Sequence, residues 1–199
     1  MARNRSGRNE YRERKKRKSP LRVILGWIVF IGVFLLLLFA LVPLVGATMK
    51  ITDGAMGPSL GIGDTVAVNH ISYLLLRPKR GDIVQFTVSE ESQGISTETK
   101  TVYLRRVIAL PGETVQIMDG IVYINGRPLE EKYTSGLTTY GGIAASQMTL
   151  NNDEYFVMAD NRSNNFDSRD STVGPIARDD ILGRVWLRIL PFEKFGRIG

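Results

Sequence analysis

Residues 114–124 read TVQIMDGIVYI, and this stretch decides the fold. Two short runs rich in β-branched residues flank Asp119 and Gly120. This dipeptide supplies the positive φ values that a tight type I′ turn needs. Asn125 and Gly126 repeat the turn signal one strand later. The stretch therefore predicts a β-hairpin followed by a further turn.

The same strand signal recurs through residues 50–199. Short runs rich in β-branched or aromatic residues occupy positions 65–69, 82–88, 101–104, 154–158 and 182–189. Residues 89–100 and 133–147 are predicted as loops, and no segment of this region shows a sustained 3.6-residue period. We predict a mainly β domain over residues 50–199, built as a folded sheet or a partly closed barrel.

The positive charge of the chain is concentrated at its N-terminus. Residues 1–22 carry ten Lys or Arg and two Glu, whereas the remaining residues carry 16 basic and 18 acidic side chains. The basic tail can set membrane topology and contact anionic lipid, or it can bind nucleic acid. We favour the first interpretation, because the rest of the chain shows no excess of positive charge.

Residues 23–49 contain 27 consecutive positions without a charged side chain. As a helix they would span about 40 Å, more than the roughly 30 Å hydrocarbon core of a bilayer. A cleavable signal peptide is the alternative, and residues 46–48 are a weak small-residue cleavage signal, but the run is too long for one. We predict one transmembrane helix at 23–49 in the cell membrane, with tail 1–22 in the cytoplasm and domain 50–199 outside.

Thiol and metal chemistry are excluded by composition. The chain has no cysteine and a single histidine, His70. Catalysis by a thiolate, cysteine metal sites and a histidine cluster are therefore not expected. We predict no cofactor and no metal.

Four sequence blocks follow the predicted anchor in order. They are GAMGPSL at 54–60, RGDIV at 80–84, YLRRVIALPGE at 103–113 and ADNRSNNFDSR at 159–169. Their order and spacing after an anchor resemble the bacterial type I signal peptidases, and the likeness covers nearly everything from the anchor to the C-terminus. The last block is the most specific, because Asp-Asn-Arg followed by Asp-Ser-Arg at this spacing is rare by chance.

The resemblance implies a mechanism and a class of partner. In the family a serine attacks the peptide carbonyl after a small side chain, and a neutral, buried lysine takes its proton. The substrate, an exported precursor, lies extended beside a strand edge and pairs through its backbone. The resemblance therefore implies exported precursors or their signal-peptide regions as partners, together with membrane lipid.

This sequence departs from the family at the reacting groups. The nucleophile position is Ala55, which has no lone pair, and the lysine position is Arg105, whose guanidinium does not deprotonate in proteins. Asp53 stands where some members place an oxyanion-donating serine, and Asn165 stands where a serine supports the lysine. Ala159 replaces the glycine that opens the last block.

Most other motif positions still match the family. The matching residues are Met56, Pro58, Asp82, Arg106, Pro111, Gly112, Asp160, Arg162, Asp167, Ser168 and Arg169. We expect the four charged residues of the last block to form a charge-assisted network that pins the loop beside the site. Arg105 is expected either to pair with Asp53, which would explain both substitutions, or to point to solvent.

A relocated active site is the weaker reading of these changes. Ser59, Thr52 and Ser168 are hydroxyls near the blocks, but none has an evident base, and His70 is read as an ordinary, partly exposed histidine. Five departures around one site favour a naturally altered site over an engineered one.

The predicted function follows from the altered site within a retained scaffold. The chain is expected to be a signal peptidase I-like protein that binds extended segments of exported precursors without cleaving them, with a role in surface-protein or pilus assembly. The alternative is a genuine signal peptidase I, a serine endopeptidase, whose dyad has been replaced by mutation. A purely structural partner of an active peptidase is a third, weaker possibility.

Overall fold

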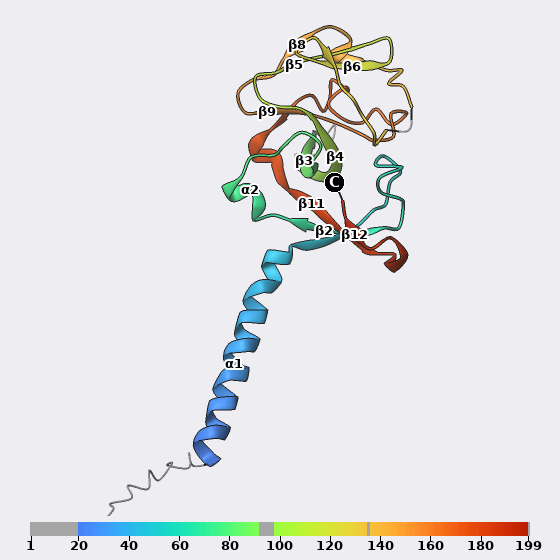
Figure 1. Ribbon diagram of the computed structural model, residues 1–199. Coiled ribbons are helices and arrows are strands. Elements are labelled where there is room, and N and C mark those ends of the chain that lie inside the picture. Colours follow the sequence, from blue (N-terminus) through green and yellow to red (C-terminus); the bar gives the residue numbers. More distant parts are fainter. Residues whose placement is uncertain (1–19, 92–97, 135, 199) are drawn as a thin grey trace, which may run out of the picture. The chain divides into compact units, whose positions relative to one another are not determined.

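The chain divides into two compact units, residues 1–41 and 42–199 (Figure 1). The computed structural model describes residues 20–91, 98–134 and 136–198. Most of the predicted basic tail, residues 1–19, lies outside the described residues.

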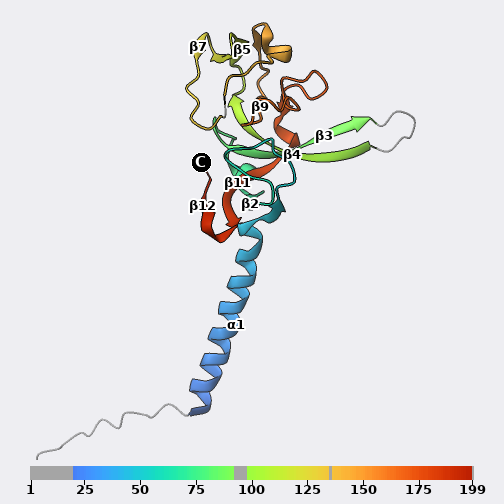
Figure 2. The same ribbon diagram turned by 90° about the vertical axis from the view of Figure 1, so that its right-hand side faces the viewer.

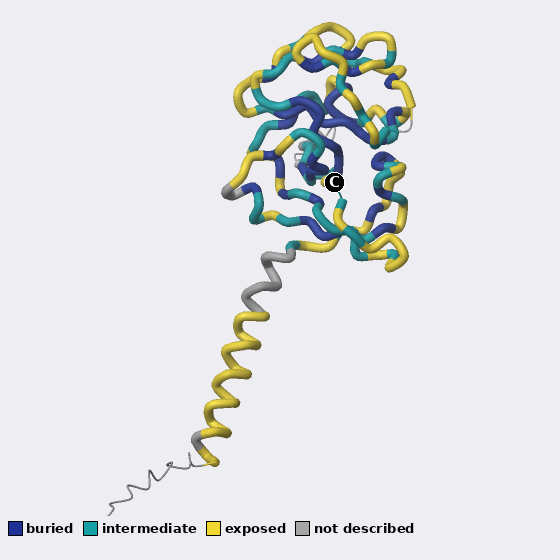
Figure 3. Tube along the Cα trace, in the orientation of Figure 1, coloured by how far each residue is buried: buried dark blue, intermediate teal, exposed yellow. Residues whose placement is uncertain are grey.

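The helix α1, Pro20–Val45, lies mostly in the first unit and ends four residues beyond its boundary at Leu41. Its described side chains are exposed apolar groups, drawn in yellow in Figure 3, and Trp27 and Leu36 are two of them. The predicted helix boundary at residue 49 is wrong, because Ala47–Lys50 form strand β1 and pair with β2. Among the residues that the structure describes, no helix combines the length and the apolarity that crossing a membrane requires. The predicted membrane span is therefore not confirmed.

The second unit is mainly β, as predicted. Its larger sheet has the strand order β1-β2-β11-β3-β4-β9-β10, with β12 beside β11, and its paired strands are antiparallel. The remaining strands of this sheet are β2 Thr65–Asn69, β3 Ile83–Glu91, β4 Glu98–Ala109, β9 Glu154–Met158, β10 Ile176–Ala177, β11 Ile181–Leu190 and β12 Gly196–Arg197. The path of described strands has two free ends, β1 and β10, so this sheet does not close into a barrel.

The smaller sheet has the strand order β7-β6-β5-β8. Its strands are β5 Thr114–Met118, β6 Ile121–Ile124, β7 Arg127–Pro128 and β8 Met148–Thr149. The turn between β5 and β6 is the predicted one, with φ values of 51° at Asp119 and 78° at Gly120. Asn125 and Gly126 repeat these positive values, at 51° and 74°, between β6 and β7. Both turn predictions are therefore confirmed.

The predicted loop at residues 89–100 is largely wrong. β3 continues to Glu91 and β4 begins at Glu98, and these two residues face each other in the antiparallel register. Figure 2 shows the two strands running side by side away from the rest of the sheet. Residues 92–97 lie outside the described ones. Short helical turns occupy other connections: α2 Ser72–Leu75, η1 Gly142–Ala145, η2 Arg178–Asp180 and η3 Phe192–Lys194.

Strand β4 supplies side chains to all three apolar cores of the unit. Leu104 packs in the first with residues of β2 and β11, Val107 in the second with β3 and β9, and Ile108 in the third with the small sheet. Between these apolar residues, β4 also carries Arg105 and Arg106, each only 1% exposed. Burying two guanidinium groups is unfavourable unless each is paired and hydrogen-bonded. The partners of these two arginines therefore define the site.

Candidate functional site

The loop after β1 carries the position of the family's nucleophile. The loop is tied at its ends, because the Ile51 N–H donates to the Asp64 carbonyl and the Gly63 N–H donates to the Ile51 carbonyl, both at 2.8 Å. Within it, Ala55 is fully buried, whereas the side chain of Asp53 is 50% exposed. The backbone at Ala55 is thus held in a fixed place beside a solvent-accessible carboxylate.

Three hydrogen bonds fix the backbone around Ala55. Its N–H donates to Oδ1 of Asp53 at 3.3 Å, and its carbonyl accepts the N–H of Asn161 at 2.9 Å. Nδ2 of Asn161 also donates to the Gly54 carbonyl at 3.3 Å. The loop of residues 159–169 is therefore bound to the loop that holds the nucleophile position.

Arg105 occupies the position of the family's lysine and is held by backbone carbonyls. Its Nε donates to the Phe166 carbonyl at 2.9 Å and its Nη1 to the Leu104 carbonyl at 2.6 Å. Its Cζ lies 5.6 Å from the centre of the Tyr103 ring. Burial lowers the pKa of the Arg105 guanidinium, and the nearby carboxylates of Asp53 and Asp167 oppose that shift.

Of the two placements considered for Arg105, the structure shows the ion pair with Asp53 and not the solvent-facing one. Nη1 of Arg105 lies 3.7 Å from Oδ2 of Asp53. One carboxylate therefore faces both the guanidinium and, through its other oxygen, the N–H of Ala55. The other altered position, Asn165, is exposed, and its carbonyl accepts the Asp167 N–H at 2.9 Å. The support of Arg105 comes instead from the next residue, through the Phe166 carbonyl.

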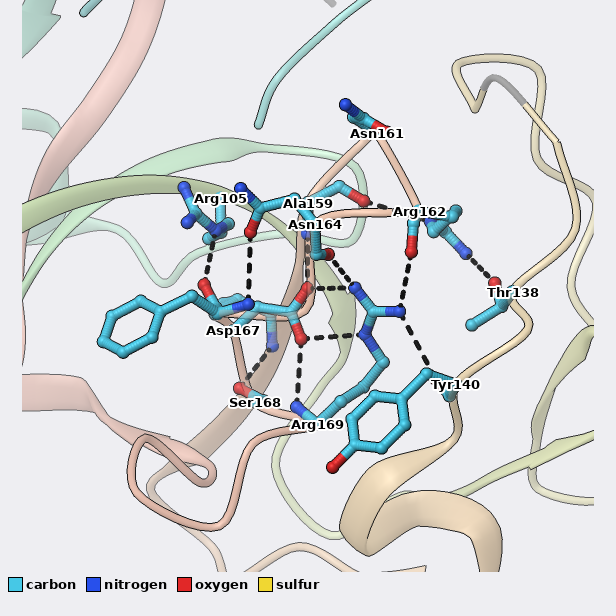
Figure 4. Close-up of polar contacts among 12 residues, drawn as sticks. Arg105, Thr138, Tyr140, Ala159, Asn161, Arg162, Asn164, Asp167, Ser168 and Arg169 are labelled. Carbon is cyan, nitrogen blue, oxygen red and sulfur yellow. Dashed lines mark hydrogen bonds and ion pairs between the residues drawn. The ribbon is translucent and has the colours of Figure 1, made fainter. Parts of the chain in front are cut away.

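The loop of residues 159–169 is organised around a buried Asp167–Arg169 pair (Figure 4). Nε of Arg169 donates to Oδ1 of Asp167 at 2.9 Å and Nη2 donates to Oδ2 at 2.7 Å. Oδ2 also accepts the N–H of Ala159 at 2.9 Å. Nη1 of Arg169 reaches the carbonyls of Arg162 and Tyr140 at 3.1 and 3.3 Å. The pair thus ties both ends of the loop together.

The other two charged residues of the block find partners elsewhere. Asp160 accepts two hydrogen bonds from Arg106, at 2.8 and 2.7 Å, and Arg106 Nη2 also donates to Ser59 Oγ at 3.1 Å. Arg162 pairs with Glu131, which the sequence analysis missed because it lies 31 positions away outside any motif. The four charged residues thus form three ion pairs, and hydrogen bonds from Arg169 to the Arg162 carbonyl and from Arg162 to the Ala159 carbonyl connect two of them within the loop.

Three other residues that match the family, Met56, Pro58 and Ser168, contribute to the fold around the site. Met56 is fully buried in the core with Leu104, and Pro58 follows a cis peptide bond and is exposed. Ser168 is buried, and its Oγ accepts the N–H of Val157 at 3.0 Å. Ser168 thereby joins the loop to strand β9.

None of the alternative hydroxyls has a general base as a partner within the described ranges. Ser59 is bonded to an arginine, Ser168 to a backbone N–H, and Thr52 is exposed. His70 is also exposed and lies just beyond the end of β2, where its Nε2 is 2.9 Å from Oε1 of Gln85. The same ranges contain no group of three or more His, Cys, Asp or Glu side chains that could hold a metal ion.

The Ala55 loop and the buried Arg105 of β4 therefore meet at one carboxylate, that of Asp53. Residues 24–190 match the family described as "Signal peptidase, peptidase S26". The chain belongs to this family, the bacterial type I signal peptidases.

Two relatives compared by sequence agree with this assignment. The chain is 34% identical over 184 residues to "Signal peptidase I" of Leptolyngbya laminosa, covering 92% of this chain and 87% of that protein. It is 34% identical over 181 residues to "Probable signal peptidase I-1" of Synechocystis, covering 91% and 90%. A crystal structure of a signal peptidase I from Enterococcus faecalis is 29% identical and covers 55% of this chain and 97% of that one, with a TM-score of 0.38.

Proposed function

We propose that this chain binds extended segments of exported precursors, or their signal-peptide regions, and does not cleave them. The observation that carries the proposal is the pairing of Asp53 with both Arg105 and the N–H of Ala55. A methyl group cannot attack a carbonyl, and a guanidinium with carbonyls as hydrogen-bond acceptors has no lone pair with which to take a proton. The nucleophile and the base are therefore both lacking.

Stabilisation of the oxyanion, the third requirement of peptide hydrolysis, is disfavoured by Asp53 as well. Acyl transfer needs hydrogen-bond donors aimed at the developing oxyanion, and the backbone N–H at the nucleophile is a common donor. Here the N–H of Ala55 donates to Oδ1 of Asp53, which is 3.3 Å away. A carboxylate at this place competes for the donor and repels the negative charge of a tetrahedral intermediate.

The retained scaffold supports a binding role. The ion pairs Arg106–Asp160 and Asp167–Arg169 are almost completely buried and hydrogen-bonded at 2.7–2.9 Å. Such pairs are costly to break, and they hold the loops around Ala55 in one arrangement. A rigid site of this kind, which has no nucleophile, can hold a polypeptide backbone without reacting with it.

Mixing the purified full chain with exported precursors tests the proposal. We expect fluorescence anisotropy to report binding and mass spectrometry to detect no mature product. The Ala55→Ser, Arg105→Lys double variant serves as the matched comparison, because it restores both reacting groups. Release of mature product by the unaltered chain at a rate typical of a peptidase would overturn the proposal.

The second candidate is a working signal peptidase whose dyad has been replaced by mutation. It is favoured by the matching residues around the site, including Met56, Pro58 and the charged residues of the last block. The double variant separates the two candidates. Full recovery of cleavage would support the second, whereas continued inactivity would show that Asp53 and Asn165 matter.

We also propose a single-pass placement in the cell membrane, with residues 1–22 in the cytoplasm and domain 50–199 outside. It is supported by the uncharged run at 23–49, the exposed apolar side chains of α1 and the basic tail. The chain has no cysteine, so single-cysteine variants give a clean readout. A membrane-impermeant maleimide should label Lys194→Cys and not Ser6→Cys in intact cells, and the reverse pattern would exclude this topology.

A further inference from the structure

Backbone carbonyls hold the guanidinium of Arg105 in place. Its Nε and Nη1 donate to the carbonyls of Phe166 and Leu104 at 2.9 and 2.6 Å, and its side chain is 1% exposed. Nη2 makes no hydrogen bond within the described part of the chain. The carbonyls orient this cation without neutralising it, so its charge is balanced by the Asp53 carboxylate, 3.7 Å away.

The carboxylate that faces Arg105 is loosely held. Oδ2 of Asp53 is 3.7 Å from Nη1 of Arg105, and Oδ1 is 3.3 Å from the N–H of Ala55. Charge-assisted hydrogen bonds are normally 2.7–2.9 Å long, as they are between Arg106 and Asp160 in the same domain. The Asp53 side chain is also 50% exposed, so it can turn into water at little cost.

Among the residues that the structure describes, no other carboxylate near Arg105 is free to take the place of Asp53. Asp167, the second acidic group that acts on Arg105, already accepts three hydrogen bonds from Arg169, two of them from its guanidinium, and one from the N–H of Ala159. Ala55 contributes neither a donor nor an acceptor from its side chain. When Asp53 turns away, the N–H of Ala55 and the guanidinium of Arg105 are left facing one site without an anion.

We propose that Asp53 occupies a binding site for the free C-terminal carboxylate of an extended peptide, with Arg105 and the Ala55 N–H as its donors. The inference rests on the proposed function, that the site holds an extended polypeptide, and it names the ligand class. A C-terminal carboxylate presents two oxygens that can replace Oδ1 and Oδ2 of Asp53, so the balance of charge is kept. The preferred ligand is therefore the product of a peptide-bond hydrolysis carried out by another enzyme, rather than an uncut chain.

Three labelled peptides test this ligand class on the full chain in detergent. One ends in Ala-Gln-Ala with a free carboxylate, the second has the same sequence with a C-terminal amide, and the third continues through that position as an uncut segment. Fluorescence anisotropy should show the free acid binding about tenfold tighter than the other two, because only it brings a carboxylate to Arg105.

Variants of Asp53 and Arg105 test whether these two residues cause the preference for the free acid. Asp53→Asn keeps an amide oxygen for the Ala55 N–H but removes the competing charge, so it should tighten binding of the free acid several-fold and leave the amide unchanged. Asp179→Asn, at an exposed carboxylate away from the site, controls for net charge and should change neither. Arg105→Gln should abolish the preference for the acid, and Arg105→Met provides the same test if the buried amide impairs folding.

The outcomes separate this inference from the proposed function. Equal affinities for all three peptides would overturn the inference and leave the proposed function standing. A preference for the acid that Asp53→Asn does not change would overturn the role assigned to Asp53, which would then act only as a local turn residue. No binding of any peptide would overturn the proposed function, and the inference with it.

Discussion

The Asp53 carboxylate lies 3.7 Å from the Arg105 guanidinium, while its other oxygen accepts the N–H of Ala55 at 3.3 Å. The two substitutions thus compensate each other, because a buried arginine needs an anion and an exposed aspartate provides one. The same contact places a negative charge where hydrolysis would need a hydrogen-bond donor.

Restoring only the dyad should therefore not restore hydrolysis. We expect Ala55→Ser with Arg105→Lys to show no precursor cleavage above background. Adding Asp53→Ser and Asn165→Ser should raise the rate by about 10²-fold or more, because an oxyanion donor typically contributes about 10²–10³ in kcat. Quantitative mass spectrometry of the mature product measures this. Full activity of the double variant would show that Asp53 does not obstruct the site.

The Arg106–Asp160 pair should be essential to stability. Both side chains are at most 1% exposed, and Asp160→Asn leaves the guanidinium without a buried counter-charge. We expect a loss of about 3–5 kcal/mol in the free energy of unfolding, measured by urea denaturation.

Glu113→Gln is the matched control for Asp160→Asn. Glu113 pairs with Arg80, but the two side chains are 19% and 30% exposed. We expect this change to cost less than about 1 kcal/mol, because water screens partly exposed ion pairs. Equal costs for the two variants would mean that burial does not decide the contribution of the pairs.

Local turn chemistry made part of the fold predictable from sequence. Asp-Gly and Asn-Gly specify positive φ values within two residues, and both turns occur as predicted. Strand β1 was not predictable in the same way, because three of its four residues continue an uncharged run and become a strand only by pairing with β2. The polar ends of β3 and β4 are likewise strands because they pair with each other.

The candidate site was also predictable from the sequence only in part. Motif matching located Asp53, Ala55 and Arg105 and gave the ion pair between Asp53 and Arg105 as one of two placements of the arginine. It could not predict that the Phe166 carbonyl holds Arg105, since a backbone acceptor has no sequence signal. It also missed Glu131 as the partner of Arg162, because that pairing joins segments 31 positions apart.

Gly142 should be required for the loop of residues 159–169. It has a φ of +54°, and a Cβ there would overlap the carbonyl oxygen of Arg169, which also accepts the Ile143 N–H at 2.9 Å. Gly126 has a φ of +74°, but a Cβ added there would meet no atom within 4 Å. We expect Gly126→Ala to lower the free energy of unfolding by about 1 kcal/mol, because of its backbone conformation alone. Gly142→Ala should lower it by about 1–3 kcal/mol more, because the added Cβ also overlaps its neighbour. Thermal and urea unfolding of the two variants compare these costs, and equal values would contradict the close packing at Gly142.

Alkaline pH should destabilise the domain through Tyr73. Its hydroxyl donates to Oδ2 of Asp82 at 2.9 Å, and burial, followed by the charge of Asp82, raises the pKa of Tyr73 above its usual value of 10.0. Below that value both the folded and the unfolded chain keep the tyrosine proton, so stability does not depend on it. Above it the unfolded chain releases the proton while the folded chain retains it, so the free energy of unfolding falls as the pH rises.

Tyr73→Phe isolates this contribution. The variant is expected to lose some stability at neutral pH, because Asp82 loses a donor, but its stability should decline less steeply above about pH 10. Burial and Glu131 raise the pKa of Tyr133 as well, so part of the decline should remain. Urea unfolding between pH 8 and 11.5 measures both slopes, with exposed Tyr140→Phe as the control. Indistinguishable slopes for Tyr73→Phe and the unaltered chain would mean that the Tyr73 hydroxyl is not protected in the folded state.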